Sequence, residues 1–262
     1  MAAFTDMMGR EVIISTPPRR VISLVPSQTE LLYDLGLDEE VIGITKFCVH
    51  PRKWFKSKQR VGGTKNINIT LVAALQPDLI IANKEENTKE QIEELALKYP
   101  IWISDIQTVE EALQMIERIG LLVNREENAA GIIQEIKNGF DKLKSAAVPR
   151  KVAYFIWRNP WMCAGGDTFI HDMICKMGWE NVMGTQMRYP TVALSELKDL
   201  GPELILLSSE PYPFKDVHIA EIKAALPGAE VMLVDGEMFS WYGSRLRLAA
   251  EYMAGLSGRY SS

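Results

Sequence analysis

The chain contains one cysteine–histidine pair with the residue types for covalent chemistry, Cys48 and His50. A thiolate beside an imidazole is the nucleophile of many enzymes. Residues two apart in an extended segment point to opposite sides, however, and the sequence offers no third residue to orient the histidine. Gly62 and Gly63 form too short a glycine segment to hold a nucleotide by themselves. We therefore expect no catalytic residues and a protein that is not an enzyme.

A metal site built from the protein's own side chains is not expected either. The histidines of the chain are His50, His171 and His218. His171 lies within a helical pattern, which is typical of a structural or surface histidine, and His218 precedes a helix, where we expect it at the surface. A cluster of His50 with Cys48 and two loop glutamates lacks the spacing of a known metal-binding motif.

The residues best suited to binding a ligand are aromatic and cationic. Aromatic faces bind large, flat, partly apolar molecules, and lysine and arginine bind carboxylates or phosphates at the edge of such molecules. For any single ring, packing in the interior is the alternative. The aromatic candidates are Trp157, Trp161, Tyr189, Tyr212, Phe239, Trp241 and Tyr242. The cationic candidates are Lys46, Lys65, Lys84, Arg158, Arg188 and Arg245.

These residues follow apolar segments that occur twice in the chain, in the same order and at nearly the same offset. Continuous apolar runs rich in Val, Ile and Leu predict parallel strands that are buried on both faces. The repetition predicts two similar lobes. The matching pairs are Arg20–Ser27 with Lys151–Arg158, Pro77–Ile81 with Pro202–Leu207, and Ile101–Asp105 with Val231–Asp235.

Helical patterns alternate with these strands, which predicts an α/β fold with a parallel sheet in each lobe. Between the repeats, residues 125–149 carry one apolar helical stripe, with acids at the start and lysines toward the end. We expect a long backbone helix at 123–149 between an N-terminal lobe, 1–122, and a C-terminal lobe, 150–262.

Ligands of open parallel sheets bind beyond the carboxyl ends of the strands. Two such sheets joined by a helix can bring those ends face to face around a cleft. The loops after the strands are therefore the predicted ligand site. From the first lobe they supply Pro26, Ser27, Gln28, Phe47, His50, Lys65, Asn66, Asn83, Lys84 and Glu85. From the second lobe they supply Trp157, Arg158, Trp161, Tyr189, Glu210, Tyr212, Trp241, Tyr242 and Arg245.

Composition narrows the class of protein further. The formal net charge of −5 gives no general attraction to nucleic acid. There is no apolar run long enough to span a membrane and no secretory signal at the start as written. Three cysteines, an odd number without metal-like pairing, fit a reducing compartment. We expect a cytoplasmic protein as written, or a periplasmic or lipid-anchored one if the start was trimmed.

Several long segments resemble the cobalamin- and ferric-siderophore-binding proteins of ABC importers. They are "RRVISLVPSQTELLYDLGLDEEVIGIT", "LVAALQPDLIIAN", "AGGDTFIHDMICKMGWENV" and "LSELKDLGPELILLSS", and "TDMMGREVIIS" resembles the hairpin that opens siderophore-binding members. The resemblance implies two Rossmann-like lobes joined by one long helix, with the ligand held between them. It also implies that any iron or cobalt arrives inside the ligand, so that the protein needs no cofactor.

The resemblance assigns part of the predicted site, and the sequence departs from it in two places. Tryptophans of cobalamin binders are replaced by Lys65 and Asn83, which makes the wall of the first lobe more polar. The glutamates that dock such proteins on a permease are replaced by Thr70 and Ser195, with Glu196 adjacent. The positions that match the cobalamin pocket are Pro26, Ser27, Gln28, Phe47, Lys65, Asn83, Trp157–Trp161 and Ser240–Tyr242.

Two functions follow from these observations. The first is a binding protein for a small-molecule metal chelate of the corrinoid or ferric-siderophore class, held non-covalently and serving an ABC permease. The alternative is a cytoplasmic enzyme or chaperone that handles a corrinoid or tetrapyrrole without a transporter partner.

Overall fold

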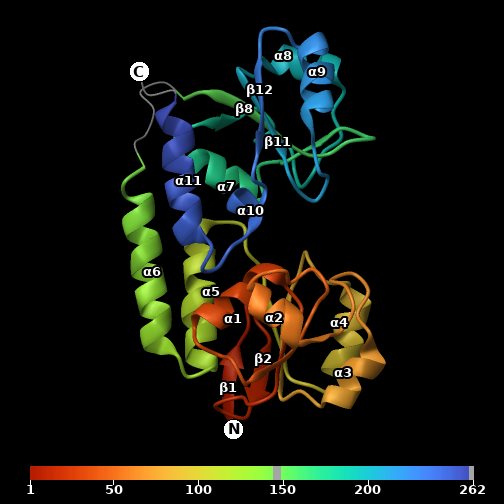
Figure 1. The fold of residues 1–262 in the computed structure, drawn as a ribbon, viewed down its shortest axis with the longest axis vertical. Helices are drawn as coiled ribbons and strands as arrows, with labels where there is room; N and C mark the ends of the chain where they lie inside the picture. Colours follow the sequence, from red (N-terminus) through yellow and green to blue (C-terminus); the bar gives the residue numbers. More distant parts are fainter. Residues whose placement is uncertain (144–148, 260–262) are drawn as a thin grey trace. The chain divides into compact units, whose positions relative to one another are not determined.

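The computed structural model describes residues 1–143 and 149–259 and divides the chain into two compact units (Figure 1). Unit 1 comprises Met1–Ile106, Glu110–Ile136 and Tyr242–Arg245. Unit 2 comprises Gln107–Val109, Lys137–Trp241 and Leu246–Ser262. A short segment late in the sequence thus belongs to unit 1. The lobe limits expected from the sequence, 1–122 and 150–262, stay a prediction.

Unit 1 is built on a parallel five-stranded sheet with the strand order β5-β4-β3-β6-β7. The interior strand β6 is buried along its whole length, as its apolar sequence predicts. The strands are β3 (Val21–Ser23), β4 (Val41–Ile44), β5 (Gln59–Arg60), β6 (Leu79–Asn83) and β7 (Ile101–Ser104).

Helices lie on both faces of this sheet. Val72 of α3 and Leu95 of α4 pack in one apolar cluster with Ile80 on one face. On the other face, Thr29 of α1 places its hydroxyl oxygen 2.7 Å from that of Ser23 in β3. The helices are α1 (Pro26–Asp34), α2 (Arg52–Ser57), α3 (Ile69–Leu75), α4 (Lys89–Ala96), α5 (Val109–Leu122) and α6 (Glu126–Phe140).

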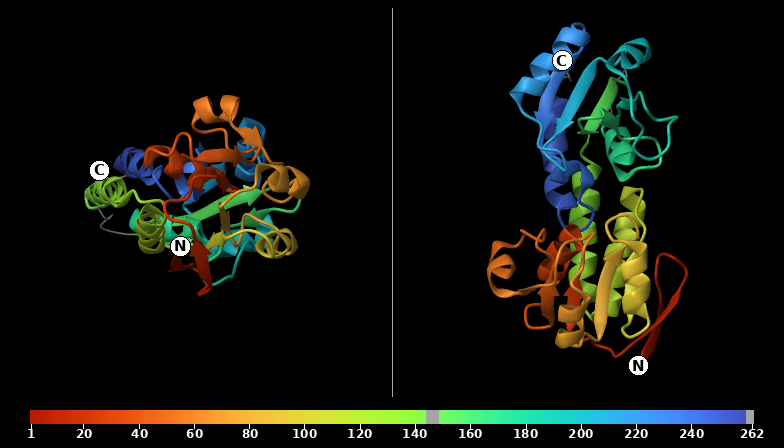
Figure 2. Two further views of the ribbon diagram at one scale, coloured as in Figure 1. Left: turned by 90° about the horizontal axis from the view of Figure 1, so that it is seen from below. Right: turned by 90° about the vertical axis from the view of Figure 1, so that its right-hand side faces the viewer.

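The chain begins with an antiparallel hairpin of β1 (Ala2–Thr5) and β2 (Glu11–Ile14), as the resemblance implies. The hairpin lies beside the edge strand β7 and is drawn in red in Figure 2. The Met7 backbone N–H donates to the Ile103 carbonyl (3.0 Å), and Arg10 Nη2 donates to the Ile101 carbonyl (3.1 Å).

Unit 2 contains a second sheet, with the parallel strand order β10-β8-β11-β12 and the short strand β9 antiparallel to β8. Leu197 of α8 and Ile222 of α9 pack on one face. Phe239 of α10 packs on Tyr154 of β8, with 5.0 Å between ring centroids. The strands are β8 (Lys151–Trp157), β9 (Met162–Cys163), β10 (Glu180–Asn181), β11 (Leu204–Ser208) and β12 (Glu230–Val234). The helices are α7 (Phe169–Lys176), α8 (Leu194–Leu200), α9 (Asp216–Ala225), α10 (Glu237–Ser240) and α11 (Leu246–Gly258).

The internal repeat of the sequence corresponds to equivalent strands of the two sheets. The three repeated segments form β3, β6 and β7 in unit 1 and β8, β11 and β12 in unit 2. In both sheets these strands are neighbours in the same order. The predicted α/β fold with two parallel sheets in two similar lobes is therefore confirmed.

The predicted backbone helix is shorter than expected. Helix α6 ends at Phe140, and residues 144–148 of the expected helix lie outside the described residues. Gly139 in the last turn weakens the helix, and Asp141 would place a negative charge at the negative end of the helix dipole. In unit 1 the helix packs on α5, where a Cβ atom at Gly120 would lie 2.4 Å from Ala129 Cβ.

Candidate functional site

The loops that follow the strands of unit 1 are supported by a buried amide network. Asn83 Nδ2 donates to Ser104 Oγ (3.0 Å), and Asn83 Oδ1 accepts from the backbone N–H groups of Glu85 (2.8 Å) and Glu86 (3.0 Å). Gln28 Nε2 donates to the same Ser104 hydroxyl. Asn83, Gln28 and Ser104 are all buried. Two of the predicted site residues, Asn83 and Gln28, therefore belong to the buried network that supports the loop after β6.

Gln28 has one further polar atom. Its Oε1 atom is buried and has no hydrogen-bond partner within the described residues. Buried polar groups in native structures are nearly always hydrogen-bonded. Gln28 lies in the first turn of α1, next to the buried Ser27 and the half-buried Pro26, so these three predicted residues form the inner wall of the loop region.

The surface of the same loops is formed by Phe47, Lys65, Asn66 and Lys84, which are exposed, with half-buried His50 and Glu85. Phe47 is 50% exposed, and Lys46 Nζ lies 5.0 Å from its ring centroid. Lys65 Nζ donates to the Glu85 carbonyl. Lys84 forms an ion pair with Asp105 (2.5 Å), so its charge is already neutralised. Lys46 and Lys65 give this surface its positive character.

Cys48 does not have the environment of a nucleophile. The residue is buried, and its Sγ lies 3.1 Å from the hydroxyls of both Thr29 and Thr45. Burial raises the pKa of the Cys48 thiol, which keeps it protonated. The expectation that Cys48 and His50 form no catalytic pair agrees with this geometry.

In unit 2, the loops after β8 and β11 form an aromatic cluster of Trp157, Trp161, Tyr212 and Phe214. Trp161 and Phe214 are stacked with an interplanar angle of 2°. Tyr212 packs edge-on against Phe214 (4.8 Å between centroids) and against Trp157 (5.6 Å). Trp157 is 40% exposed, and Trp161 and Tyr212 are half-buried. The cluster therefore leaves part of its aromatic surface accessible, most of all at Trp157, at the carboxyl ends of two neighbouring strands.

Arg158 adds a cation to this aromatic cluster. Its guanidinium lies 5.3 Å from the Trp161 ring centroid. Its Nε and Nη2 atoms donate to the two carboxylate oxygens of Glu221 (2.9 and 2.8 Å). Bidentate pairs of this kind fix the orientation of the guanidinium plane. Arg158 is thus held in a fixed orientation beside the aromatic cluster.

Other predicted residues of unit 2 lie deeper. Trp241 is buried, and its Nε1 atom donates to Glu210 Oε1 (2.9 Å), which also accepts from Ser240 Oγ (2.8 Å). Tyr189 is half-buried with the Arg188 guanidinium 5.7 Å from its ring centroid. Phe239, an aromatic candidate from the sequence, is fully buried in the core.

The substitution Glu210→Gln tests whether burial raises the pKa of the Glu210 carboxyl. Burial raises the pKa of Glu210, against the opposing hydrogen bonds of Ser240 and Trp241. Because the folded protein binds this proton more tightly, the free energy of unfolding falls as the pH rises from the ordinary value of 4.5 through the raised pKa. Glutamine at this position stays neutral at every pH. The melting temperature of the variant should therefore rise relative to that of the wild type between about pH 4 and pH 8. Glu90→Gln on the exposed face of α4 is the control, and a difference independent of pH would contradict the assignment.

Tyr242 and Arg245 belong to unit 1, in the segment that returns to it late in the sequence. Arg245 is buried, and its Nε and Nη2 atoms donate to both carboxylate oxygens of Glu30 in α1 (2.8 and 2.7 Å). Tyr242 is also buried. Gly243 has φ +117°, and a Cβ atom there would lie 3.2 Å from the Ser27 carbonyl oxygen. The segment is therefore packed closely on the start of α1.

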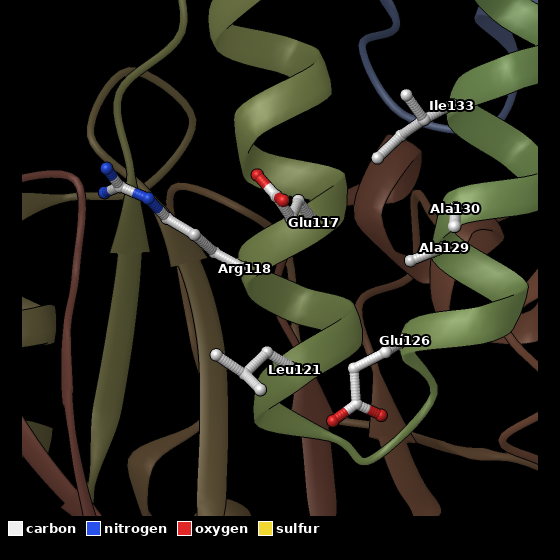
Figure 3. A pocket seen from close by; sticks show the side chains of 7 residues that line it. All are labelled: Glu117, Arg118, Leu121, Glu126, Ala129, Ala130 and Ile133. Atoms are coloured by element: carbon white, nitrogen blue, oxygen red, sulfur yellow. The ribbon is translucent and has the colours of Figure 1, made fainter.

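A pocket of about 480 Å³ lies between α5 and α6 of unit 1 (Figure 3). None of the ligand-site residues predicted from the sequence lines this pocket. Figure 3 shows its lining on the two packed helices: Glu117, Arg118, Leu121, Glu126, Ala129, Ala130 and Ile133. This pocket is a groove between two helices, lined by three charged and four apolar side chains, and none of its lining residues belongs to the strand-end loops.

Sequence reasoning missed four residues that organise the two loop regions. Ser104 is the last residue of β7, and its hydroxyl accepts hydrogen bonds from the side-chain amides of Gln28 and Asn83. Phe214 is a member of the aromatic cluster, His218 packs against it, and Glu221 binds Arg158. His218, expected at the surface before a helix, is instead buried in the first turn of α9. The only available signal was the position of Ser104 at the end of an apolar strand and of Phe214 two residues after Tyr212.

No three or more His, Cys, Asp or Glu side chains are grouped to hold a metal ion within residues 1–143 and 149–259. None of the helices in the part of the chain that the structure describes has the length and apolar character needed to cross a bilayer. The positions implied for permease docking lie in helices: Thr70 in α3 and Ser195 in α8. Glu196 Oε2 accepts from the Ala193 N–H (3.0 Å) at the start of α8.

Residues 21–229 match the model of the periplasmic binding protein family, and the chain belongs to this family. A vitamin B12-binding protein of Pectobacterium carotovorum is 26% identical over 89% of this chain and 86% of its own length. An uncharacterized ABC transporter substrate-binding lipoprotein of Bacillus subtilis is 26% identical over 77% of this chain and 67% of its own length.

Among solved structures, a periplasmic heme-binding protein from Roseiflexus shares the fold with a TM-score of 0.79. It is 19% identical, and the match covers 93% of this chain and 99% of that one. The family resemblance, the fold class and the role as a binding protein are thereby confirmed. The alternative of a cytoplasmic enzyme or chaperone and the expectation of a cytoplasmic location find no support among these relatives.

Proposed function

We propose that the protein is the substrate-binding component of an ABC importer for a metal chelate of the corrinoid or ferric-siderophore class. The observation that carries this proposal is the aromatic cluster beside Arg158 at the strand ends of unit 2, in which Trp157 is 40% exposed and Trp161 and Tyr212 are half-buried. Accessible aromatic surface packs on a flat, partly apolar ligand, and the N–H groups of Arg158 that do not bind Glu221 can donate to polar groups at its edge. The named ligands of the relatives, vitamin B12 and heme, have this combination of surfaces.

The loops of unit 1 carry a second surface with groups suited to such a ligand. Phe47 offers another exposed ring, and Lys46 and Lys65 offer cations on the loops after β4 and β5. The buried contacts of Asn83, Gln28 and Ser104 hold the neighbouring loop in one conformation. A loop that is ordered before binding lowers the entropic cost of association. Binding is non-covalent, because the ligand-facing groups are rings, cations and amides.

The proposed partner is an ABC permease, and the proposed location is the periplasm or a lipid anchor. Both follow from the family and from the relative described as a substrate-binding lipoprotein. With Thr70 and Ser195 at the docking positions of unit 1 and unit 2, a permease would contact polar but uncharged side chains there.

A ligand panel tests the proposal. Purified protein is heated in the presence of cobalamin, cobinamide, haemin or a ferric siderophore, and the melting temperature is measured at rising ligand concentration. A ligand that binds only the folded protein stabilises it by about 2.7 kcal/mol at a concentration of 100 times Kd. We expect at least one member of the panel to raise the melting temperature in this dose-dependent way. A melting curve that no member shifts would refute the chelate proposal.

A further inference from the structure

His218 is a buried residue in the first turn of α9 that packs against two members of the aromatic cluster. Its ring packs edge-on against Tyr212 and Phe214, with 5.4 Å between centroids in each case. Its Nδ1 atom accepts a hydrogen bond from the Lys215 backbone N–H (2.9 Å). Its Nε2 atom lies 3.2 Å from the Tyr212 hydroxyl oxygen. One imidazole thus connects the start of α9 to the loop after β11.

These contacts determine where the imidazole carries its hydrogen. Nδ1 accepts from a backbone N–H, so Nδ1 has a free lone pair and the ring hydrogen is on Nε2. Nε2–H is therefore the donor, and the Tyr212 hydroxyl oxygen is the acceptor. A phenolic hydroxyl has one hydrogen of its own. That hydrogen points away from His218 and is available to another acceptor.

We propose that His218 positions Tyr212 so that its hydroxyl donates a hydrogen bond to an oxygen atom at the edge of the ligand. The inference rests on the proposed function, since it assumes that Tyr212 contacts the ligand. His218 acts through Tyr212 and is a positioning residue. It selects ligands that carry a carboxylate or carboxamide oxygen at this point over ligands that present an N–H donor.

The surroundings of Tyr212 agree with an oxygen acceptor. Trp157 packs edge-on against the Tyr212 ring and is 40% exposed. The Arg158 guanidinium lies over the Trp161 ring of the same aromatic cluster, and Glu221 fixes its orientation through two of its nitrogens. Near a ligand oxygen bound by the Tyr212 hydroxyl, Arg158 can contribute only those N–H groups that do not bind Glu221.

Three substitutions separate the positioning role from a merely structural one. Tyr212→Phe removes the hydroxyl and keeps the ring. In His218→Asn, the side-chain oxygen replaces Nδ1 as the acceptor for the Lys215 N–H, and the donor to Tyr212 is lost. In His218→Gln, the terminal amide replaces the Nε2–H donor to Tyr212, and the acceptor for Lys215 is lost. The asparagine variant therefore preserves the start of α9, and the glutamine variant preserves the contact with Tyr212.

The first measurement needs no ligand. Nitrogen-15 NMR of the free protein should show the His218 ring with its hydrogen on Nε2, and a hydrogen on Nδ1 would overturn the proposal. The second measurement is the Kd for haemin, with its carboxylates, and for cobalamin, with its carboxamides. For whichever binds, we expect Tyr212→Phe and His218→Asn each to raise Kd about tenfold and His218→Gln to raise it by much less.

The double variant Tyr212→Phe/His218→Asn is the decisive comparison. If His218 acts through the hydroxyl, adding His218→Asn to Tyr212→Phe leaves Kd unchanged. Independent effects that multiply would overturn the positioning role while leaving the proposed function intact. Absence of binding by either probe to the wild type would overturn the selection of carboxylate and carboxamide oxygens, while a ferric siderophore that raises the melting temperature would leave the proposed function intact.

Discussion

Replacing Arg245 with methionine is expected to lower the free energy of unfolding by about 3–5 kcal/mol, because it leaves the Glu30 carboxylate without its partner in a mostly buried site. Arg245 is 7% exposed, and the Glu30 side chain is 16% exposed. Both of its hydrogen bonds to Glu30 are shorter than 3 Å. Chemical denaturation followed by circular dichroism measures the change.

Two further variants identify the source of this loss. Glu30→Gln combined with Arg245→Met removes both charges, so the double variant should recover much of the stability. Arg52→Met replaces an exposed arginine of α2 in the same unit and should change the unfolding free energy by less than about 0.5 kcal/mol. If Arg245→Met left stability unchanged and abolished ligand binding, Arg245 would be a ligand residue and the structural role would be wrong.

The ion pair of Glu30 and Arg245 shows which features the sequence could not reveal. Its partners are 215 positions apart, and each looks like an ordinary surface charge in its own segment. The network of Gln28, Asn83 and Ser104 is similar, because its members come from three elements that only the folded sheet brings together. Contacts between distant segments depend on the exact packing of elements, and no local pattern records them.

The strands were predictable, because their signal is local. β6 and β11 are buried on both faces, and each is a continuous apolar run in the sequence. Their recurrence predicted two equivalent sheets, which the strand orders confirm. Whether an aromatic side chain near a strand end is exposed or buried was not predictable from a local pattern. Trp157 is 40% exposed while Trp241 is 8% exposed, although both follow predicted strands in the second half of the chain.

Trp157→Ala is expected to weaken ligand binding by about 10–100-fold, since tryptophan side chains at the centre of binding surfaces often contribute about 2 kcal/mol or more. The ring is already 40% exposed and packs edge-on against Tyr212, so its loss removes an accessible aromatic face. The expected effect on stability is smaller than the effect on affinity. Calorimetric titration of the ligand identified by the panel gives Kd, and thermal denaturation without ligand gives the stability.

The size of the aromatic face should govern the affinity at position 157. Trp157→Phe keeps part of the stacking surface and should lose less affinity than alanine. Leu97→Ala is the matched control, because Leu97 is a large apolar residue, 84% exposed and outside the strand-end loops. Equal affinities of wild type, Trp157→Ala and Leu97→Ala would exclude the aromatic cluster from the binding site, because a ligand stacked on it would lose much of its contact area.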